Sequence, residues 1–468
     1  MRPPVMTPQQ VYLATMPLRP GHFRVLVTCG LGQVIGTALA TVVGIVIPLM
    51  QIVGRPELSA TMQGVVGCAN LAGIAAGASV LGRVADRHGY LAVFMACPAL
   101  ILAAALVSVF VPSLPVLIAC LFAMGFCIGG EYSLDSGYTS ELMPQRWRST
   151  MVGIVKASCA LGNILAAGLC YGVLSGGLAP QHWPKLMWIV AAVAAAMLVS
   201  RIGFVQSPQW LLEHGRNAEA QNAVKSLFGS DVRIIQSAVP SSAADAADAS
   251  ESTPAFIRRN FSKVVLCGIP WACEGLGVYG IGVFLPVLVA SLGLEHFAAG
   301  APPVEHIATS VRITLWISFI ILPGFLLGLF MLRRAGKIPL QSWGFFLSCA
   351  SLAALLISFE LRWDSWITIG AFMAFELFLN MGPHLVTFVL PASIFPVYDR
   401  ARGAGIAACL GKVGAVLGVF FMPLLLHAGG MRCVLIVSAA VMLTGGLVTA
   451  IVGPGQTQNA ASGRSQRQ

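Results

Sequence analysis

Charged residues are scarce in this chain of 468 residues. Asp, Glu, Lys and Arg together make up 10% of the sequence, whereas hydrophobic residues make up 57% and the mean hydropathy is +0.82. Water-soluble globular proteins have a charged fraction of about 25%, so the composition excludes that class. The sequence instead predicts an all-α protein that crosses a lipid bilayer many times.

Signatures of soluble enzymes are also missing. The sequence contains no phosphate-binding G-x-x-x-x-G-K-[ST] motif and no G-x-S-x-G or H-E-x-x-H motif. Its twelve cysteines form no C-x-x-C pair and have no metal-ligand spacing with histidine, so they indicate small packing residues. We therefore expect no enzyme activity, no cofactor and no metal site.

The apolar runs that are long enough to span a bilayer, about 20 residues each, number twelve by our reading. Six lie within residues 24–205 and six within 263–452. Residues 206–262 between them are predicted to form a cytoplasmic loop with short amphipathic helices and a low-complexity linker. Residues 1–23 and 453–468 are predicted to be polar tails.

The net charge of +10 follows the membrane topology and does not indicate a nucleic-acid partner. Basic residues lie in short clusters between apolar runs, and no basic patch is interleaved with aromatic residues. Of the 28 Lys and Arg residues, 21 fall on the side of the bilayer that holds the N-terminus, and five fall on the other side. The positive-inside rule then predicts that both termini face the cytoplasm of a bacterial-type inner membrane.

The two halves of the chain are related to each other. The stretch from Met124 to Asn163 has a fainter copy that begins near Glu376, and a shift of 252 positions superposes Gly130 on Gly382. Parallel repeats of six spans are known in secondary transporters, where the substrate site lies near the bilayer midplane between the halves. The repeat therefore predicts transport by alternating access.

Three segments resemble the major facilitator superfamily. The loop G-R-V-A-D-R-H-G-Y (82–90) resembles the G-x-L-a-D-R-x-G-R signature of that superfamily. The segment G-G-E-Y, followed by Y-T-S-E-L-M-P-Q-R-W-R, and the segment V-Q-S-P-Q-W-L-L-E-H-G-R-N-A-E-A (205–220) resemble its sugar-porter and metabolite:proton symporter branches. The resemblance implies two pseudo-symmetric six-helix halves and cytoplasmic loops that act as a gate. The predicted gate residues are Asp86, Arg87, Glu141, Arg148 and Arg400.

The sequence also departs from the sugar porters. Gln206 and Gln209 stand where acidic and basic residues are usual, no glutamate in the second-half loop matches Glu141, and the terminal P-E-T-K-G motif is absent. Many metabolite symporters of this branch carry aspartates in the first span, where this chain has I-G-T-A-L-A-T (35–41). If those aspartates couple protons in relatives, this chain either lacks that proton-coupling role or has it on a residue outside the first span.

Acidic residues within the spans are candidates for proton coupling, because ionisable groups in a bilayer are costly and mark function. Glu274, at the repeat position of Gly36, is the strongest candidate for the moved role. Glu131 and Asp135 share one helical face, and we expect Lys156 on the next span to be their partner. Alternatively, serine or backbone groups satisfy Glu274, and Asp135 lies solvated at the cytoplasmic interface.

Two lysines in the spans predict an anionic substrate. Lys156 and Lys412 fall on matching faces of the fifth and eleventh spans, so both are expected to point into the central cavity from opposite halves. In the alternative interpretation each lysine extends to the membrane surface, and His384 on the tenth span is a packed core residue. The predicted substrate-binding set is completed by His384, Asn380, Tyr279 and Trp271.

Together these features predict a secondary transporter that takes up a small organic anion with protons and functions as a monomer in the bilayer. One alternative is a proton-driven exporter of drugs or of a siderophore-like metabolite, because the apolar first span suits amphipathic cargo. A second alternative is a membrane sensor that binds a solute without net transport.

Overall fold

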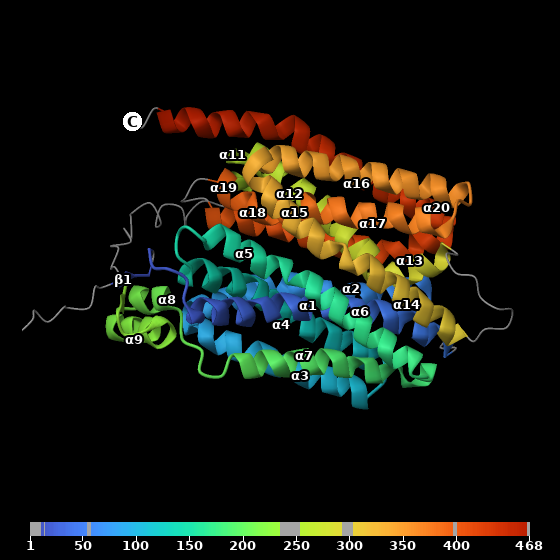
Figure 1. The fold of residues 1–468 in the computed structure, drawn as a ribbon, viewed down its shortest axis with the longest axis horizontal. Coiled ribbons are helices and arrows are strands. Elements are labelled where there is room, and N and C mark those ends of the chain that lie inside the picture. The colour runs from blue at the N-terminus through green and yellow to red at the C-terminus, as the bar shows by residue number, and fades with distance from the viewer. Residues whose placement is uncertain are drawn as a thin grey trace, which may run out of the picture.

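The computed structural model describes residues 11–13, 15–53, 58–234, 253–292, 303–395 and 400–465. The protein is a bundle of long helices that run side by side (Figure 1). Helices of the first half, in blue and green, form one group, and helices of the second half, in yellow to red, form the other. Most of the low-complexity linker predicted within 206–262 lies outside the described residues.

The first half consists of six membrane-spanning segments. Four are single helices, the fifth is divided at Ser158, and the sixth begins with a 3₁₀ turn, η1. In chain order the elements are β1 (Val11–Tyr12), α1 (Pro20–Ile52), α2 (Ala60–His88), α3 (Tyr90–Phe110), α4 (Leu114–Leu142), α5 (Arg148–Ala157), α6 (Cys159–Ser175), η1 (Pro180–Leu186) and α7 (Met187–Ser200). The central loop contributes α8 (Pro208–Glu213), α9 (Asn217–Phe228) and β2 (Val232–Arg233).

The second half repeats this plan with more interrupted helices. A π-helical turn, η2, follows α12, and α17 gives way to α18 at Gly382. The elements are α11 (Thr253–Arg259), α12 (Phe261–Gly275), η2 (Leu276–Ile281), α13 (Leu285–Ser291), α14 (Pro303–Phe319), α15 (Ile321–Ala335), α16 (Lys337–Glu360), α17 (Ser365–Met381), α18 (Pro383–Val389), α19 (Pro391–Ile394) and α20 (Arg400–Ser465).

Helix α20 accounts for the number of spans. The described residues contain eleven helical stretches that are long and apolar enough to cross a membrane, and the last of them covers 54 residues. Its backbone departs from helical geometry at Gly430, where φ is 63°. Gly430 falls between the predicted spans 403–427 and 432–452, so both predicted spans lie within this one stretch. The helix also continues to Ser465, through most of the segment predicted as a polar tail.

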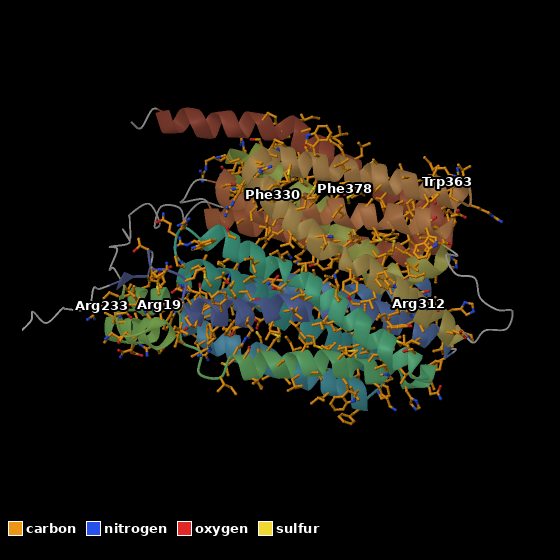
Figure 2. All side chains as sticks on the ribbon, in the orientation of Figure 1. Arg19, Arg233, Arg312, Phe330, Trp363 and Phe378 are labelled. Carbon is orange, nitrogen blue, oxygen red and sulfur yellow. The ribbon has the colours of Figure 1, made fainter. Side chains whose placement is uncertain are left out.

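The start of α1 is fastened to the central loop at the end of the bundle where Arg19 and Arg233 lie, which we call the terminal end (Figure 2). The Arg19 guanidinium donates to both carboxylate oxygens of Asp231, at 2.8 and 2.5 Å, and to the Phe228 carbonyl at 2.6 Å. Its hydrogen bonds hold the pKa of the Asp231 carboxyl below the usual range. Strands β1 and β2 pair in parallel beside this contact.

The backbones of the two halves also meet toward the opposite end of the bundle, where Arg312 and Trp363 lie (Figure 2). A Cβ atom added to Gly44 of α1 would lie 1.8 Å from the Val283 carbonyl oxygen, and one added to Gly64 of α2 would lie 2.5 Å from the Phe420 carbonyl oxygen. Only glycine permits such a close approach of backbones. The halves are therefore closed against each other there by direct backbone packing.

Replacement of Gly44 by alanine is expected to force the halves apart. Overpacking of this kind costs about 1–3 kcal/mol, so the thermal unfolding midpoint of the protein in detergent should fall. The matched control is Gly282→Ala on the facing segment, where an added Cβ meets nothing within 4 Å. Equal midpoints for the Gly44→Ala and Gly282→Ala proteins would contradict the proposed backbone contact.

Candidate functional site

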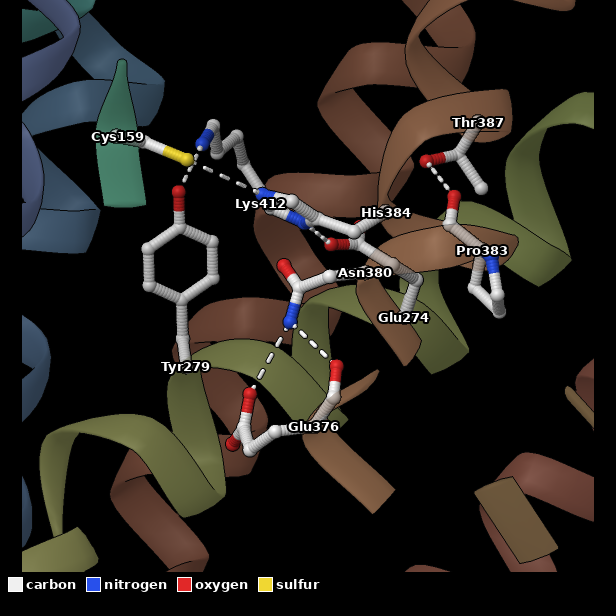
Figure 3. A network of polar contacts seen from close by, with 9 residues as sticks. All are labelled: Cys159, Glu274, Tyr279, Glu376, Asn380, Pro383, His384, Thr387 and Lys412. Atoms are coloured by element: carbon white, nitrogen blue, oxygen red, sulfur yellow. Dashed lines mark hydrogen bonds and ion pairs between the residues drawn. The ribbon is translucent and has the colours of Figure 1, made fainter. Parts of the chain in front are cut away.

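A carboxylate and an imidazole face each other in the second half of the bundle. Glu274 of α12 and His384 of α18 are 2% and 6% exposed, and a hydrogen bond joins His384 Nδ1 and Glu274 Oε1 (Figure 3). On the other side of the ring, His384 Nε2 lies 4.0 Å from Cys159 Sγ of α6. The imidazole thus contacts both halves, and Glu274 has a titratable partner instead of the serine or backbone partner of the alternative interpretation.

The π-helical turn η2 begins two residues after Glu274 and carries Tyr279 into the same region. Turns of this type occur often at functional sites, because they shift the side chains that follow them. Lys412 of α20 donates to the Tyr279 hydroxyl at 3.5 Å (Figure 3), and its ammonium lies 4.9 Å from the centroid of the Tyr279 ring. Lys412 also lies 4.7 Å from the centroid of the Tyr132 ring, which belongs to α4 in the other half.

Lys156 approaches the same tyrosine from the first half. Its ammonium lies 5.5 Å from the centroid of the Tyr132 ring and 5.8 Å from that of Phe388 in α18. Lys156 is buried, so it does not extend to the membrane surface. Both predicted lysines therefore lie at the interface of the two halves, as cations on aromatic faces.

The remaining predicted substrate residues lie around this centre. Asn380 of α17 donates its amide to the Glu376 backbone carbonyl at 2.8 Å and to the Glu376 carboxylate at 3.1 Å (Figure 3). Trp271 of α12 packs its indole against Gly411 of α20, where an added Cβ would lie 2.6 Å from the ring. Asn380 is thus engaged with a neighbouring carboxylate, whereas Trp271 supports the helix that carries Lys412.

Glu131 has a different partner from the one predicted. The expectation of a pair with Lys156 was wrong, because Glu131 is held by Arg201 at the end of α7. The guanidinium donates to both carboxylate oxygens, with 2.9 Å to Oε1, and also to the Phe94 carbonyl, and neither charged side chain has any exposed surface. Arg201 also stacks 3.5 Å from the centroid of the Phe94 ring. This bidentate pair is sealed away from the lysine centre.

Asp135 likewise does not contact Lys156. The side chain is fully buried, so the alternative of a solvated position at the membrane surface is also wrong. Its Oδ2 atom accepts from the Gln33 amide of α1 at 3.2 Å. Asp135 therefore lies against the first helix, whose predicted span lacks acidic residues.

The predicted gate residues lie at the terminal end. Glu141 accepts from the Ser207 hydroxyl at 2.6 Å and from the Gln209 backbone N–H at 2.5 Å, so it binds the start of α8. Arg87 and Arg148 are exposed, and the side chains of Asp86 and Arg400 lie outside the described residues. A contact across the halves comes instead from Arg333 of α15, which donates to the Thr150 hydroxyl of α5 at 3.0 Å.

Sequence reasoning missed four residues that contribute to these contacts: Tyr132, Cys159, Arg201 and Gln33. Tyr132 directly follows Glu131 in the quoted G-G-E-Y segment, so its place beside a buried charge was a usable signal. Arg201 falls within residues 24–205 of the predicted first half, and the sequence analysis did not single it out as a functional residue. Among the described residues, no three His, Cys, Asp or Glu side chains are grouped to hold a metal ion.

The arrangement combines two cations at the interface of the halves with a titratable pair whose imidazole touches both halves. Such a centre can bind an anion and exchange a proton, and any rocking motion of the halves would change both sets of contacts. These are the elements of a secondary transporter, in which one binding region is exposed alternately to the two sides of a membrane.

Comparison with known proteins defines the class. The family model described as "Sugar (and other) transporter" matches residues 26–457. The chain therefore belongs to this transporter family within the major facilitator superfamily, and it is a multi-pass membrane transporter rather than an enzyme.

Two curated relatives and one solved structure illustrate the likeness. The inner membrane metabolite transport protein YgcS of Escherichia coli is 26% identical and is matched over 96% of this chain and 95% of its own length. A repressible high-affinity phosphate permease of Neurospora crassa is 23% identical over 74% of this chain and 66% of its length. The crystal structure of a D-xylose-proton symporter, 15% identical, matches in fold with a TM-score of 0.72 and covers 91% of this chain and 97% of that chain.

Loss of either member of the buried Glu131 and Arg201 pair is expected to destabilise the first half strongly. Glu131→Gln or Arg201→Met leaves an uncompensated buried charge, which costs about 3–5 kcal/mol. Removal of both charges together should restore part of that loss, which thermal unfolding of the single and double variants in detergent can measure. Purely additive losses in the double variant would argue against a direct pair.

Proposed function

We propose that this protein is a secondary transporter that moves a small anion together with protons by alternating access. The observation that carries the proposal is the placement of both Lys412 and Lys156 close to the Tyr132 ring, at the interface of the two halves. The cargo would bind between the two ammonium groups, and the Glu274 and His384 pair would carry the coupled proton.

The lysines support an anionic cargo because their charges are poorly compensated. The buried ion pairs of the described bundle, Glu131 with Arg201 and Glu274 with His384, involve neither lysine. The lysines contact aromatic rings, which provide less stabilisation than a carboxylate does. An anion bound between the two ammonium groups would supply the missing negative charge, and it would link the two halves while it is bound.

The names of the relatives are compatible with a small anionic cargo, but they do not agree on one substrate. One is a metabolite transport protein and another a phosphate permease. We therefore propose an anion of low mass, either an organic acid or inorganic phosphate. A neutral sugar, as in the D-xylose symporter, would bring no negative charge to the two lysines.

Proton coupling is supported by the contacts of Glu274. Its carboxylate bonds to an imidazole, which itself contacts Cys159 of the first half, so a change of proton occupancy would alter an interface between the halves. Glu274 also lies one helical turn before Tyr279, which bonds to Lys412. Proton uptake and anion binding would then act on neighbouring groups, which is the requirement for coupling.

For membrane orientation, we propose that the terminal end faces the cytoplasm of an inner membrane, because most Lys and Arg residues lie on that side. The predicted gate residues would then act there, with Glu141 holding α8 and Arg333 joining α15 to α5. Import is the direction that we propose, driven by protons that enter with the anion.

Lys412→Met should weaken anion binding by about tenfold or more, since a charged hydrogen-bonding partner is worth about 1.5–3 kcal/mol. Binding of organic acids and phosphate to the purified protein by calorimetry measures the effect. Lys225→Met on the surface helix α9 is the matched control and should bind normally. Equal affinity of the Lys412→Met and control proteins would contradict the proposed role.

Glu274→Gln should abolish accumulation driven by a pH gradient and should spare exchange of labelled for unlabelled substrate, because the amide cannot carry a proton. Uptake into proteoliposomes with and without an imposed gradient measures both activities. Glu376→Gln, a buried carboxylate of the same half bonded to Asn380, is the matched control and should keep its gradient dependence. Gradient-driven accumulation by the Glu274→Gln protein would refute the assignment.

A further inference from the structure

A second carboxyl group, in the first half, lies in an incomplete hydrogen-bonded pair. Asp135 of α4 and Gln33 of α1 are 0% and 3% exposed, and Gln33 Nε2 donates to Asp135 Oδ2 at 3.2 Å. Asp135 Oδ1 and Gln33 Oε1 are among the buried side-chain atoms of the described residues that have no hydrogen-bond partner. Both orphaned atoms are oxygens, so as they stand they can only accept.

The position is shaped for this carboxyl group. A Cβ atom added to Gly32, the residue before Gln33, would lie 2.1 Å from Asp135 Oδ2. The backbone of α1 therefore reaches the carboxyl group only because residue 32 is glycine. The carboxyl group is therefore packed against the α1 backbone at Gly32 and is hydrogen-bonded to the Gln33 side-chain amide, so its position is fixed on both sides.

The surrounding charges do not neutralise an ionised Asp135. Glu131, one turn earlier on α4, is negative, and its bidentate bonds occupy the Arg201 guanidinium. Among the described residues, Cys29 of α1 and Tyr132 of α4 are further titratable groups that interact with this carboxyl, and neither carries a positive charge. Lys156 contacts Tyr132 and Phe388 instead. An ionised Asp135 would thus be a buried negative charge without a counter-ion, which is a costly arrangement.

One proton resolves both problems. We propose that Asp135 holds a proton on Oδ1 and donates it to Gln33 Oε1, so that the acid and the amide form a closed ring of two hydrogen bonds. The proton satisfies both orphaned oxygens and removes the unpaired charge. Asp135 with Gln33 is then a proton-binding site of the first half, separate from Glu274 in the second half.

This site extends the proposed proton-coupled transport, because it adds one titratable position to the transport cycle. The carboxylic acid can release its proton to water only when α1 and α4 part enough to hydrate the pair, which leaves the carboxylate ion on α4. Rearrangement of the first half would therefore be linked to loss of one proton, and the return step to its uptake.

The test is infrared spectroscopy of the full-length protein in lipid, without substrate, through the C=O stretching band of protonated carboxyl groups. Wild type should show a component of this band that Asp135→Asn lacks. The asparagine variant can form the same ring as an amide pair, so it should fold, and its unfolding midpoint checks this. Gln33→Leu removes the acceptor, so the Asp135 component should move to the frequency of a more weakly bonded acid.

An unchanged band in the Asp135→Asn protein would show that Asp135 is ionised and would overturn the proposal. If the component disappears in Asp135→Asn but does not move in Gln33→Leu, the acid is protonated without the amide as its acceptor, and the proposed pair is wrong. Neither result depends on the substrate or on Glu274, so a failure here is distinguishable from a failure of the proposed transport function.

In proteoliposomes, the ratio of protons to substrate should fall by one in the Asp135→Asn protein relative to wild type, as measured from the reversal of transport under opposed gradients. An unchanged ratio would remove Asp135 from the transport cycle, even if the infrared band shows it to be protonated.

Discussion

The cost of placing a charge inside a bilayer constrains every functional feature of this structure. Each ionisable side chain in the bundle is expected to pair with an opposite charge, to be neutral through its protonation state, or to bind a charged ligand. Glu131 meets the first requirement through Arg201, and Glu274 meets it through His384. Lys156 and Lys412 lie on aromatic rings, so in the proposed function they are available to bind a negatively charged cargo.

The charged residues make two kinds of contact, some within one half of the bundle and some between the halves. The Glu131 and Arg201 pair joins α4 to α7 within the first half and has no exposed surface, which suits a fixed scaffold. His384 and Lys412, in contrast, each contact a residue of the opposite half, namely Cys159 and Tyr132. In the proposed transport cycle, contacts of this second kind would break when the halves rock, and they would link proton and substrate binding to movement.

Much of the fold was predictable from sequence, because hydrophobic length and internal repetition are strong signals in membrane proteins. The all-α membrane fold and the family followed from apolar runs and quoted motifs, and the last two predicted spans lie in one helical stretch that is interrupted at Gly430. The spacing of the lysines on matching helices also placed both of them at the interface of the halves.

The pairing of charges was less predictable. Sequence proximity suggested Lys156 as the partner of Glu131, but the partner is Arg201, which comes 70 residues later in the chain. Helix packing determines which charges meet, and a single sequence gives no direct information on that packing. For the same reason the sequence did not show Gln33 beside Asp135, or Cys159 beside His384.

The central claim, that an anion is moved together with protons, is tested most directly by wild-type protein in proteoliposomes. Organic acids, inorganic phosphate, neutral sugars and cationic amines would be offered under a pH gradient of either sign, with internal pH recorded. The account predicts that at least one small anion accumulates against its gradient when protons flow inward, and that the lumen acidifies as it does. Accumulation of neutral sugars or amines alone, or anion uptake that ignores the pH gradient, would contradict it.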